Sequence, residues 1–350
     1  MMSLSQQCSI TLSTLIANFV EAVNCPVVDI TGIALDSRQV EAGDLFVAIK
    51  GAEVDGSAFI PQAVERGAVA VLTEKGQATG SSVSGAVPVI GIENLSEYVS
   101  DIAGVFYGHP SRQMALTAIT GTNGKTTCSR LYAELVEKLS SSPAAFVGTL
   151  GYGMAGSPAG TYIPALGETG LTTPDAVAMQ RILAELESRG ARTAALEVSS
   201  HSLVQRRVAG LHVDTAVFTN LSRDHLDYHG DLATYAAAKS RLFAMTGLKN
   251  AVINIDDSVG RMILENLDPQ IRAITYSLEG QDTGRAADID CRTIGLSPEG
   301  LRAAIHTPWG DGELRSPLLG KFNLANLLAV IGAAIAQGFA LADILRVVPD

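Results

Sequence analysis

The chain has few basic residues, and this shortage limits its partners. Lys and Arg together number 25 against 36 Asp and Glu, which gives a formal net charge of −11. Nucleic acids and anionic membranes are bound by clustered Lys and Arg on a protein surface. We therefore expect neither partner, and an anionic ligand must be held by a few basic residues concentrated at one site.

Long apolar runs and paired cysteines are also missing. The longest apolar stretch, Leu327 to Ala336, is about half of what a bilayer span needs and predicts a buried helix. The segment Met1 to Thr11 lacks the basic start and apolar core of a secretory signal. Four cysteines are scattered without metal-ligand or redox spacing: Cys8, Cys25, Cys128 and Cys291. These features predict a cytoplasmic protein with reduced, buried thiols.

What the chain does contain is enough apolar sequence for two domains. It has 350 residues, of which 47% are hydrophobic. Up to residue 94, short β-type runs surround one helical pattern, Phe59 to Arg66, which ends at Gly67. The β-type runs are Leu45 to Ile49, Val69 to Leu72 and Pro88 to Ile90. We predict a small mixed α/β domain over residues 1–94.

From Met114 onward, apolar runs alternate with helical patterns, which is typical of a parallel sheet covered on both faces. The clearest helix, Pro174 to Arg189, has Thr173 as its expected N-cap and Gly190 just past its end. The expected strands are Ala115 to Thr120, Thr193 to Val198, Thr215 to Thr219 and Ala251 to Ile255. The sequence thus predicts an α/β protein with a mainly parallel sheet in a central domain over residues 95–344, followed by the start of a linker over residues 345–350.

A phosphate-binding loop is predicted between the strand Met114 to Thr120 and the helix Lys125 to Leu139. Such a loop directs backbone N–H groups and the positive end of the helix dipole at one point. Lys125 would neutralise phosphates and Thr126 would ligate Mg²⁺, although Ile119 stands where the usual pattern has glycine. The loop is Gly121, Thr122, Asn123, Gly124, Lys125, Thr126 and Thr127. An ordinary turn with an exposed lysine is the alternative.

Polar residues follow two further strands, where ligands sit in open α/β sheets. Glu197 follows one and His225 the other, so both can converge on a phosphate-bound Mg²⁺ with Thr126. A zinc site at His225 and His229 is one alternative, disfavoured because that spacing pairs two ligands only on a helix, and Tyr228 to Asp231 suggests a turn that precedes one. A plain polar loop is another.

Taken together, these motifs resemble the Mur ligases, the UDP-N-acetylmuramoyl-peptide ligases, and in particular the branch that forms the muramoyl tripeptide. The resemblance runs from about Ile30 to Asp350. It implies an ATP-dependent ligase of peptidoglycan synthesis, a process on which cell shape and division depend. ATP would phosphorylate the D-glutamyl carboxylate of UDP-N-acetylmuramoyl-L-alanyl-D-glutamate. The amine of an added amino acid, meso-diaminopimelate or L-lysine, would then displace the phosphate.

The resemblance also implies individual roles. Glu197 and His225 correspond to Mg²⁺ residues, Lys239 to a lysine carried as a carbamate, and Asn323 to a residue facing the nucleotide. From the residues alone, Lys239 is an ordinary solvated lysine and Asn323 a helix N-cap. Residues implied to contact the muramoyl peptide are Thr172, Thr173, Ser199, Gln205 and Arg207. Some relatives have Asn where this chain has Leu171, and others Gly where it has Ser202.

In the first domain, Asp36-Ser37-Arg38 resembles part of a uridine-nucleotide-binding domain. Ser37 offers a hydroxyl, and Arg38 offers a cationic fork for a diphosphate. Without the resemblance this segment is a charged turn. Residues implied to surround the uracil and diphosphate are Leu35, Ser37, Ala52, Glu53 and Val54.

Several expectations concern the whole protein. Family members have a third domain that supplies the amino-acid pocket, and the chain is expected to end where that domain begins. We therefore expect a monomeric fragment that ligates poorly or not at all. Neither the added amino acid nor the general base can be assigned. A folylpolyglutamate-synthase-like ligase and a non-catalytic nucleotide-binding module are the alternative functions.

Overall fold

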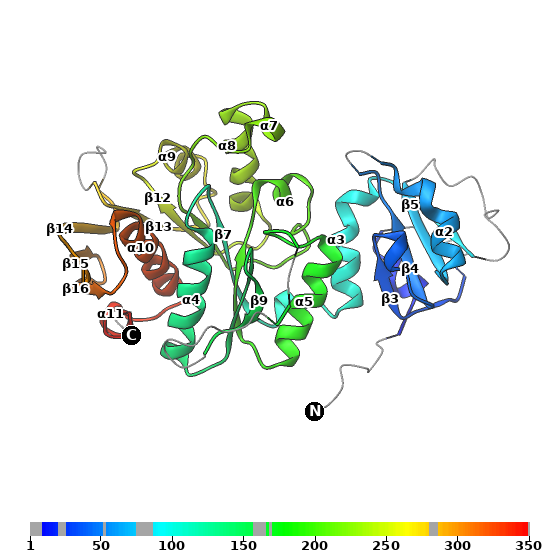
Figure 1. The fold of residues 1–350 in the computed structure, drawn as a ribbon, viewed down its shortest axis with the longest axis horizontal. Helices are drawn as coiled ribbons and strands as arrows, with labels where there is room; N and C mark the ends of the chain where they lie inside the picture. Colours follow the sequence, from blue (N-terminus) through cyan, green and yellow to red (C-terminus); the bar gives the residue numbers. More distant parts are fainter. Residues whose placement is uncertain are drawn as a thin grey trace. The chain divides into compact units, whose positions relative to one another are not determined.

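The computed structural model shows a mixed α/β protein, which confirms the predicted fold class (Figure 1). It describes residues 9–19, 26–51, 54–74, 87–156, 166–167, 170–279 and 286–348. Two compact units are present. The first comprises residues 1–110, 175–184 and 205–211, and the second comprises the rest. Within the described ranges, no helix is long and apolar enough to cross a membrane.

The first unit is built on a parallel four-stranded sheet in the order β3-β4-β5-β6. Leu45 and Val47 of β4 pack in one apolar cluster with α1 and α3, and Phe46 and Ala48 pack in another with α2. Successive side chains of a strand point to opposite faces, so helices on both faces require the continuous apolar run seen in the sequence. The elements are β1 (Ile10–Thr11), α1 (Leu12–Ile16), β2 (Asp29–Ile30), β3 (Gly32–Ala34), η1 (Ser37–Gln39), β4 (Asp44–Ala48), η2 (Gly56–Phe59), α2 (Ile60–Glu65), β5 (Ala70–Glu74), β6 (Val89–Ile92) and α3 (Leu95–Phe106).

The second unit contains a ten-stranded sheet in the order β16-β15-β14-β13-β12-β11-β7-β10-β8-β9. All neighbouring pairs from β8 to β14 are parallel, which confirms the predicted parallel centre. Antiparallel pairing of β9 with β8, and of β14, β15 and β16, completes the two edges. The strands are β7 (Ala115–Thr120), β8 (Ala144–Gly148), β9 (Gly151–Met154), β10 (Thr193–Glu197), β11 (Thr215–Phe218), β12 (Asn250–Asn254), β13 (Arg272–Ser277), β14 (Ile289–Ser297), β15 (Gly300–Thr307) and β16 (Gly310–Ser316).

Helices α4 and α10 lie side by side on one face of this sheet (Figure 1). They share a core cluster in which Tyr132 and Leu328 pack with strand residues Ile119, Val217 and Val252. Helix α11 packs against the edge strand β16. The helices from residue 110 onward are η3 (Pro110–Arg112), α4 (Lys125–Ser140), α5 (Ala176–Ser188), α6 (Ser200–Val204), α7 (Leu226–His229), α8 (Leu232–Ser240), η4 (Arg241–Ala244), α9 (Ser258–Glu265), α10 (Lys321–Ala336) and α11 (Leu341–Val347).

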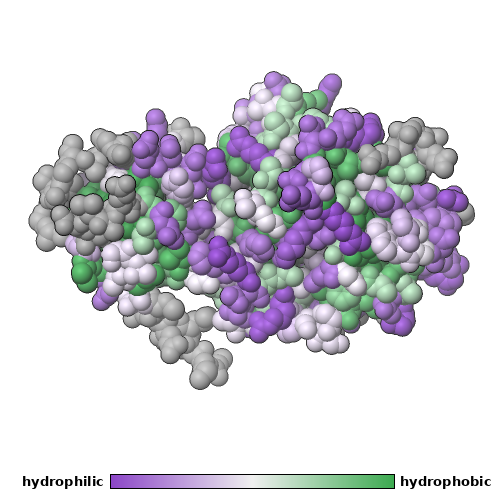
Figure 2. Space-filling model, turned by 180° about the vertical axis from the view of Figure 1, so that it is seen from behind, coloured by the Kyte–Doolittle hydropathy of each residue, from purple (hydrophilic) through white to green (hydrophobic). Residues whose placement is uncertain are grey.

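The strand order places the candidate motifs together at the carboxyl ends of three central strands. Strands β10, β7 and β11 are adjacent and parallel, with Glu197 level with Ile119 and Phe218 level with Thr120. Their carboxyl ends therefore lie together, as expected at the ligand-binding edge of an open α/β sheet. The face in Figure 2 shows hydrophilic residues spread among smaller hydrophobic areas.

Three local predictions were wrong. Helix α5 is capped not by Thr173 but by Asp175, whose Oδ1 accepts from the backbone N–H groups of Val177 and Ala178 at 2.9 Å each. Helix α10 begins at Lys321 after Gly320, so Asn323 lies in its first turn and is not its N-cap. In the turn expected from Tyr228 to Asp231, the first two residues instead end the short helix α7, whereas Gly230 and Asp231 lie outside helices and precede α8.

Candidate active site

The phosphate loop joins β7 directly to α4. Gly124 has a φ of 88°, a left-handed conformation that glycine adopts without steric cost, and α4 begins at the next residue. The Lys125 ammonium folds back on its own loop and donates to the carbonyls of Gly121 and Thr122, both at 2.9 Å. Burial lowers the pKa of Lys125, and the nearby charges of Glu197 and Asp224 oppose this shift. A bound phosphate would give this buried cation a stronger acceptor than two neutral carbonyls.

The segment after β11 is clamped to the phosphate loop by a residue that sequence reasoning missed, Asn220. Its side-chain amide donates to the Asn123 carbonyl at 3.1 Å, and its side-chain oxygen accepts from the Asn123 N–H at 3.0 Å. Its backbone carbonyl accepts from the Thr122 N–H at 2.8 Å. The place of Asn220 just beyond a predicted strand was the available signal. The loop conformation is therefore fixed by a neighbouring strand end as well as by its glycines.

Glu197 is the buried carboxylate at the end of β10, with only 1% of its surface exposed. Its Oε2 accepts from the Thr126 hydroxyl at 2.9 Å and lies 3.1 Å from Thr149 Oγ1, while Oε1 accepts from the Thr149 N–H at 3.0 Å. Burial raises the pKa of Glu197, and these hydrogen bonds and the charge of Lys125 oppose the rise. The chain at Gly148 approaches the carboxylate closely on one side. A Cβ on Gly148 would lie 1.9 Å from Glu197 Oε1.

This donor set fits magnesium. The Glu197 carboxylate and the Thr126 hydroxyl are hard oxygen ligands already in contact, and Mg²⁺ needs only one or two such protein groups beside phosphates and water. Among the described hydrogen bonds and ion pairs, none joins Glu197 to His225. The structure therefore brings together two of the three predicted Mg²⁺ residues, Glu197 and Thr126. Among the residues that the structure describes, no three His, Cys, Asp or Glu side chains are grouped to hold a metal ion.

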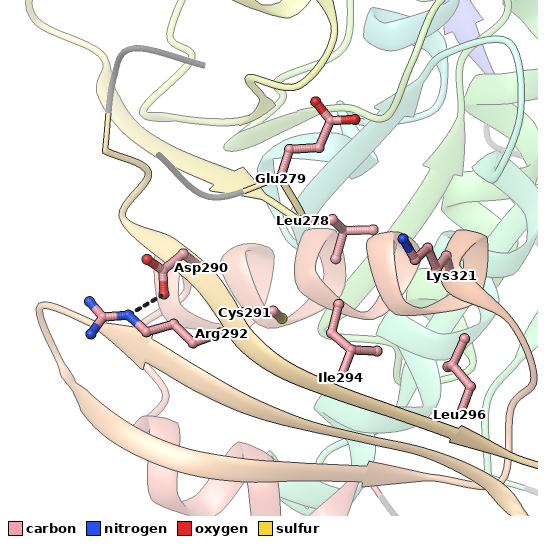
Figure 3. Close-up of a pocket in the computed structure, with 8 residues that line it drawn as sticks. All are labelled: Leu278, Glu279, Asp290, Cys291, Arg292, Ile294, Leu296 and Lys321. Atoms are coloured by element: carbon pink, nitrogen blue, oxygen red, sulfur yellow. Dashed lines mark ion pairs between the residues drawn. The ribbon is translucent and has the colours of Figure 1, made fainter. Parts of the chain in front are cut away.

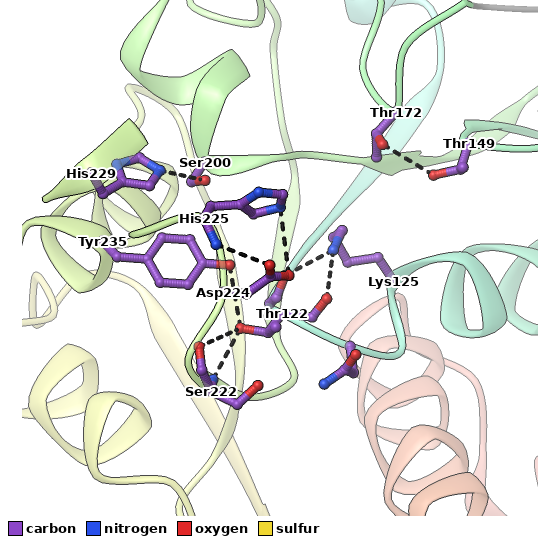
Figure 4. Close-up of polar contacts among 12 residues, drawn as sticks. Thr122, Lys125, Thr149, Thr172, Ser200, Ser222, Asp224, His225, His229 and Tyr235 are labelled. Carbon is purple, nitrogen blue, oxygen red and sulfur yellow. Dashed lines mark hydrogen bonds and ion pairs between the residues drawn. The ribbon is translucent and has the colours of Figure 1, made fainter. Parts of the chain in front are cut away.

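His225 belongs to a cluster of aromatic rings beside the phosphate loop (Figure 4). Its Nε2 lies 3.6 Å from Asp224 Oδ2, and its ring meets His201 edge-on at a centroid distance of 5.0 Å. The backbone of His225 has a φ of 52°, an uncommon conformation for a residue with a side chain. Such strain tends to occur at functional positions.

His229 and Tyr235 extend this cluster toward the phosphate loop. His229 Nε2 lies 2.8 Å from Ser200 Oγ, and its ring stacks on Tyr235 at a centroid distance of 4.9 Å. The Tyr235 hydroxyl lies 3.3 Å from Thr122 Oγ1. Burial lowers the pKa of His229, with the charges of neighbouring His and Lys groups acting in the same direction. His229 thus faces a serine and a tyrosine, which is a structural arrangement and not a zinc-ligand geometry.

Lys239 is almost completely buried, unlike the solvated lysine that its residue type would suggest. Its Nζ donates to the Gly121 carbonyl at 2.8 Å and lies 4.5 Å from the centre of the Tyr235 ring. Burial, aided by the charge of Lys125, lowers the pKa of Lys239 to about 7. A substantial fraction of the amine is therefore neutral and nucleophilic near neutral pH.

The predicted muramoyl-peptide residues of the second unit form a hydrogen-bonded group. Thr173 Oγ1 donates to the Glu197 carbonyl at 2.8 Å and accepts from the Ser199 N–H at 3.0 Å. Thr172 Oγ1 lies 3.2 Å from Thr149 Oγ1 (Figure 4). Thr149 was not singled out from the sequence, because a threonine after a short apolar strand has no distinctive pattern.

The other predicted substrate residues lie in the first unit. Ser37 is buried and donates to Gln62 Oε1 at 2.6 Å, whereas Arg38 is exposed and pairs with Asp36 at 2.7 Å. Leu35 is half-buried. Val54 is exposed, Gln205 Oε1 accepts from Arg207 Nε at 2.9 Å, and Ala52 and Glu53 lie outside the described residues.

Asn323 lies near the phosphate loop through its neighbour Asn326. The Asn326 side chain is close to the loop, because a Cβ on Gly124 would lie 2.3 Å from its Oδ1. Asn326 Nδ2 donates to Asn323 Oδ1 at 3.4 Å, and Asn323 Nδ2 donates to the Leu319 carbonyl at 2.9 Å. The N-terminal part of α10 therefore approaches the phosphate loop through Asn326.

A separate cavity of about 710 Å³ lies along β14, beside the residues that follow β13 and the start of α10 (Figure 3). None of the sequence-predicted site residues lines it. Its charged lining is mixed in sign, and Asp290 Oδ1 lies 3.7 Å from Arg292 Nε. The lining residues are Leu278, Glu279, Asp290, Cys291, Arg292, Ile294, Leu296 and Lys321.

Family models match most of the chain. Residues 119–334 match the model described as the Mur ligase middle domain, and residues 29–107 match the one described as the Mur ligase family, catalytic domain. Similar curated proteins include the UDP-N-acetylmuramoyl-L-alanyl-D-glutamate--2,6-diaminopimelate ligases of Pseudomonas aeruginosa and Coxiella burnetii. The first is 48% identical over 91% of this chain and 62% of its own length. The second is 42% identical over 86% of this chain and 60% of its own length.

Solved structures give the same picture. A structure of UDP-N-acetylmuramoyl-L-alanyl-D-glutamate--2,6-diaminopimelate ligase superimposes with a TM-score of 0.82 at 32% identity, covering 97% of this chain and 66% of that one. MurF from Acinetobacter baumannii shares the fold, with a TM-score of 0.67 at 21% identity over 97% of this chain and 68% of that one. The chain spans about three fifths of the length of the curated relatives it matches.

Proposed function

Since this chain belongs to the Mur ligase family, we propose that it binds ATP with Mg²⁺ and UDP-N-acetylmuramoyl-L-alanyl-D-glutamate for an amide ligation of peptidoglycan synthesis. The added amino acid would be meso-diaminopimelate, as the names of the similar curated proteins state for those proteins, or L-lysine. The observation that carries the proposal is the direct contact between the buried Glu197 carboxylate and the Thr126 hydroxyl of the phosphate loop. This contact unites an acidic metal ligand with a nucleotide-binding loop.

The residues of this chain would act mainly by positioning and by charge. Lys125 would leave the Gly121 and Thr122 carbonyls and bind phosphate oxygens, stabilising charge on the transferring phosphoryl group. Glu197 and Thr126, with His225, would hold Mg²⁺, which when bound neutralises phosphate charge. The net charge of −11 supports a small anionic substrate at a local basic site in preference to nucleic acid.

Substrate positioning is proposed for two sets of residues. Thr172, Thr173 and Ser199 of the second unit, together with Gln205 and Arg207, would contact the muramoyl peptide. The first domain, proposed as residues 1–94, would bind the uridine diphosphate through the segments around Ser37 and Val54. The ATP-binding domain is proposed as residues 95–344.

Lys239 is proposed to carry a carbamate. Formation of the carbamate requires a neutral amine, and the lowered pKa of Lys239, about 7, supplies one. Carbon dioxide would add to Nζ with loss of one proton, and the product is an additional carboxylate beside the phosphate loop. ¹³C-bicarbonate should give a carbamate carbonyl signal by NMR that is absent from Lys239→Met. An unmodified Lys239 at saturating bicarbonate would contradict this assignment.

Equilibrium binding is the main test, because the chain matches about three fifths of the length of its curated relatives. We expect saturable binding of a non-hydrolysable ATP analogue with Mg²⁺ and of the UDP-muramoyl dipeptide, measured by calorimetry. Phosphate release with ATP and each candidate amine is measured in parallel. Failure to bind both ligands would refute the proposal. Binding of folate in place of the UDP-muramoyl dipeptide would instead favour a folylpolyglutamate-synthase-like ligase.

A further inference from the structure

Thr149 lies where the hydrogen bonds of the nucleotide site meet those of the muramoyl-peptide site. It follows β8, and its backbone N–H donates to Glu197 Oε1 at 3.0 Å. Its hydroxyl oxygen lies 3.1 Å from Glu197 Oε2. The same oxygen lies 3.2 Å from Thr172 Oγ1 (Figure 4). Since Thr126 Oγ1 lies 2.9 Å from the same Oε2, a continuous chain of polar contacts runs from the phosphate loop to Thr172.

The Thr149 hydroxyl has one proton for two acceptors. A carboxylate is the stronger acceptor, so the hydroxyl donates to Glu197 while Oε2 is available, and its contact with the second acceptor, Thr172 Oγ1, is then the weaker one. When a cation engages Glu197 Oε2, that oxygen becomes a weaker acceptor. The Thr149 proton can then turn toward Thr172 or toward an oxygen of a ligand bound beside it.

Exposure supports a role in ligand binding. Glu197 is 1% exposed, whereas Thr149 is exposed and Thr172 is half-buried. A solute at the surface therefore meets Thr149 and Thr172 before it meets the carboxylate. The direction of the Thr149 hydroxyl therefore depends on whether a cation engages Glu197, and this direction affects ligands at the surface.

We infer that Thr149 is a positioning residue that couples binding of the Mg²⁺-nucleotide at the phosphate loop to binding of the anionic acyl substrate beside Thr172. The inference rests on the proposed function and adds to it a residue that links the two ligands. Coupling of this kind is reciprocal, so each ligand must tighten the binding of the other by the same factor.

The test compares two variants of the chain. Thr149→Val removes the hydroxyl but keeps the β-branched shape and the backbone bond to Glu197, and Thr149→Ser restores a hydroxyl. The affinity for the UDP-muramoyl dipeptide is measured by calorimetry with and without a saturating Mg²⁺-AMPPNP complex. Thr193→Val is the matched control, since it removes a buried threonine hydroxyl from the opposite end of β10.

In the unmodified chain we expect Mg²⁺-AMPPNP to tighten dipeptide binding about tenfold, within the roughly 5- to 150-fold range of typical couplings. Thr149→Val should reduce this factor to nearly one, while Thr149→Ser and Thr193→Val keep most of it. A purely structural role would weaken each ligand separately and leave the factor unchanged. Undiminished coupling in Thr149→Val, or no coupling in the unmodified chain, would overturn the inference about Thr149 and leave the proposed function standing. Failure of the unmodified chain to bind either ligand overturns the proposed function, and the inference with it.

Discussion

The phosphate-loop site and the Asp36-Ser37-Arg38 turn were both recognised as short polar motifs, yet they are held in opposite ways. At the first, Glu197 and Lys239 are buried and bonded to segments distant in the sequence, as in the contact between Lys239 and Gly121, while Lys125 is half-buried. At the second, the Arg38 side chain is 79% exposed and pairs with a residue two positions away. The first site depends on contacts between segments that are distant in the sequence, whereas the Arg38 contact of the second joins near neighbours.

This difference has an energetic meaning. A buried charge costs several kcal/mol unless neighbouring groups compensate it, so the second unit must hold its charged groups in place through the fold. An exposed pair contributes about 0–1 kcal/mol and leaves its side chains free to exchange partners. Substitutions should therefore have large effects on both binding and stability at the phosphate loop, and mainly small ones at the turn.

Removal of the Lys125 ammonium should have the largest effect. Lys125→Ala should weaken ATP-analogue binding by about 100-fold, because charge-assisted hydrogen bonds to phosphate contribute ~1.5–3 kcal/mol each. The measurement is calorimetric titration in Mg²⁺. Lys138→Ala, near the other end of α4, is the matched control and should change the affinity less than about twofold. Equal affinities of the two variants would contradict a phosphate-binding role for the loop.

Gly148→Ala tests the close packing around Glu197. Its Cβ would lie 1.9 Å from Glu197 Oε1, so the carboxylate must move. We expect about 1–3 kcal/mol of destabilisation in urea unfolding and loss of the Mg²⁺ dependence of nucleotide binding. Gly295→Ala is the control, because the nearest atom to the new Cβ is 4.0 Å away. It should change neither the stability nor the Mg²⁺ dependence of nucleotide binding. A fully stable Gly148→Ala with normal Mg²⁺ dependence would show that this packing is not needed.

Lys239→Met tests the pH dependence of the buried amine. Its pKa is about 7 in the folded chain, below the ordinary lysine value of 10.5, so between these pH values the unfolded chain binds a proton that the folded chain does not. The free energy of unfolding should therefore gain about 1.4 kcal/mol per pH unit from this residue as pH rises above 7. Urea unfolding at pH 7.5 and 9.0, in bicarbonate-free buffer, should show a flatter dependence for Lys239→Met. The same slope in both proteins would mean that Lys239 is solvated.

The smallest effects are expected at the turn. Ser37→Ala should cost about 1 kcal/mol of stability, because it removes the bond to Gln62. Arg38→Ala should change stability by less than about 0.5 kcal/mol, since the side chain is exposed. Both should weaken UDP-muramoyl-dipeptide binding several-fold. If Arg38→Ala destabilised the fold as much as Gly148→Ala, the contrast between the two regions would be lost.

The sequence was informative where one segment specified its own structure. Strand β7 has the predicted bounds, and the parallel pairing of β10, β7 and β11 is what apolar runs alternating with helices predict, although their order in the sheet was not predicted. It was less informative where distant residues decide the outcome. Nothing near Lys239 in the sequence indicates its burial, which depends on Gly121 and Tyr235. Thr149 and Asn220 escaped notice for the same reason, since their partners lie far away along the chain.

The edge strand β16 has a consequence for the solubility of the protein. An exposed edge offers unpaired backbone groups to any other strand, and chains joined in this way aggregate. Here α11 packs against β16, and charged residues alternate along it at Asp311, Glu313 and Arg315. A second chain that added a strand there would have to place its own side chains beside those charges. The largest sheet of the molecule is thus protected from open-ended growth at this edge.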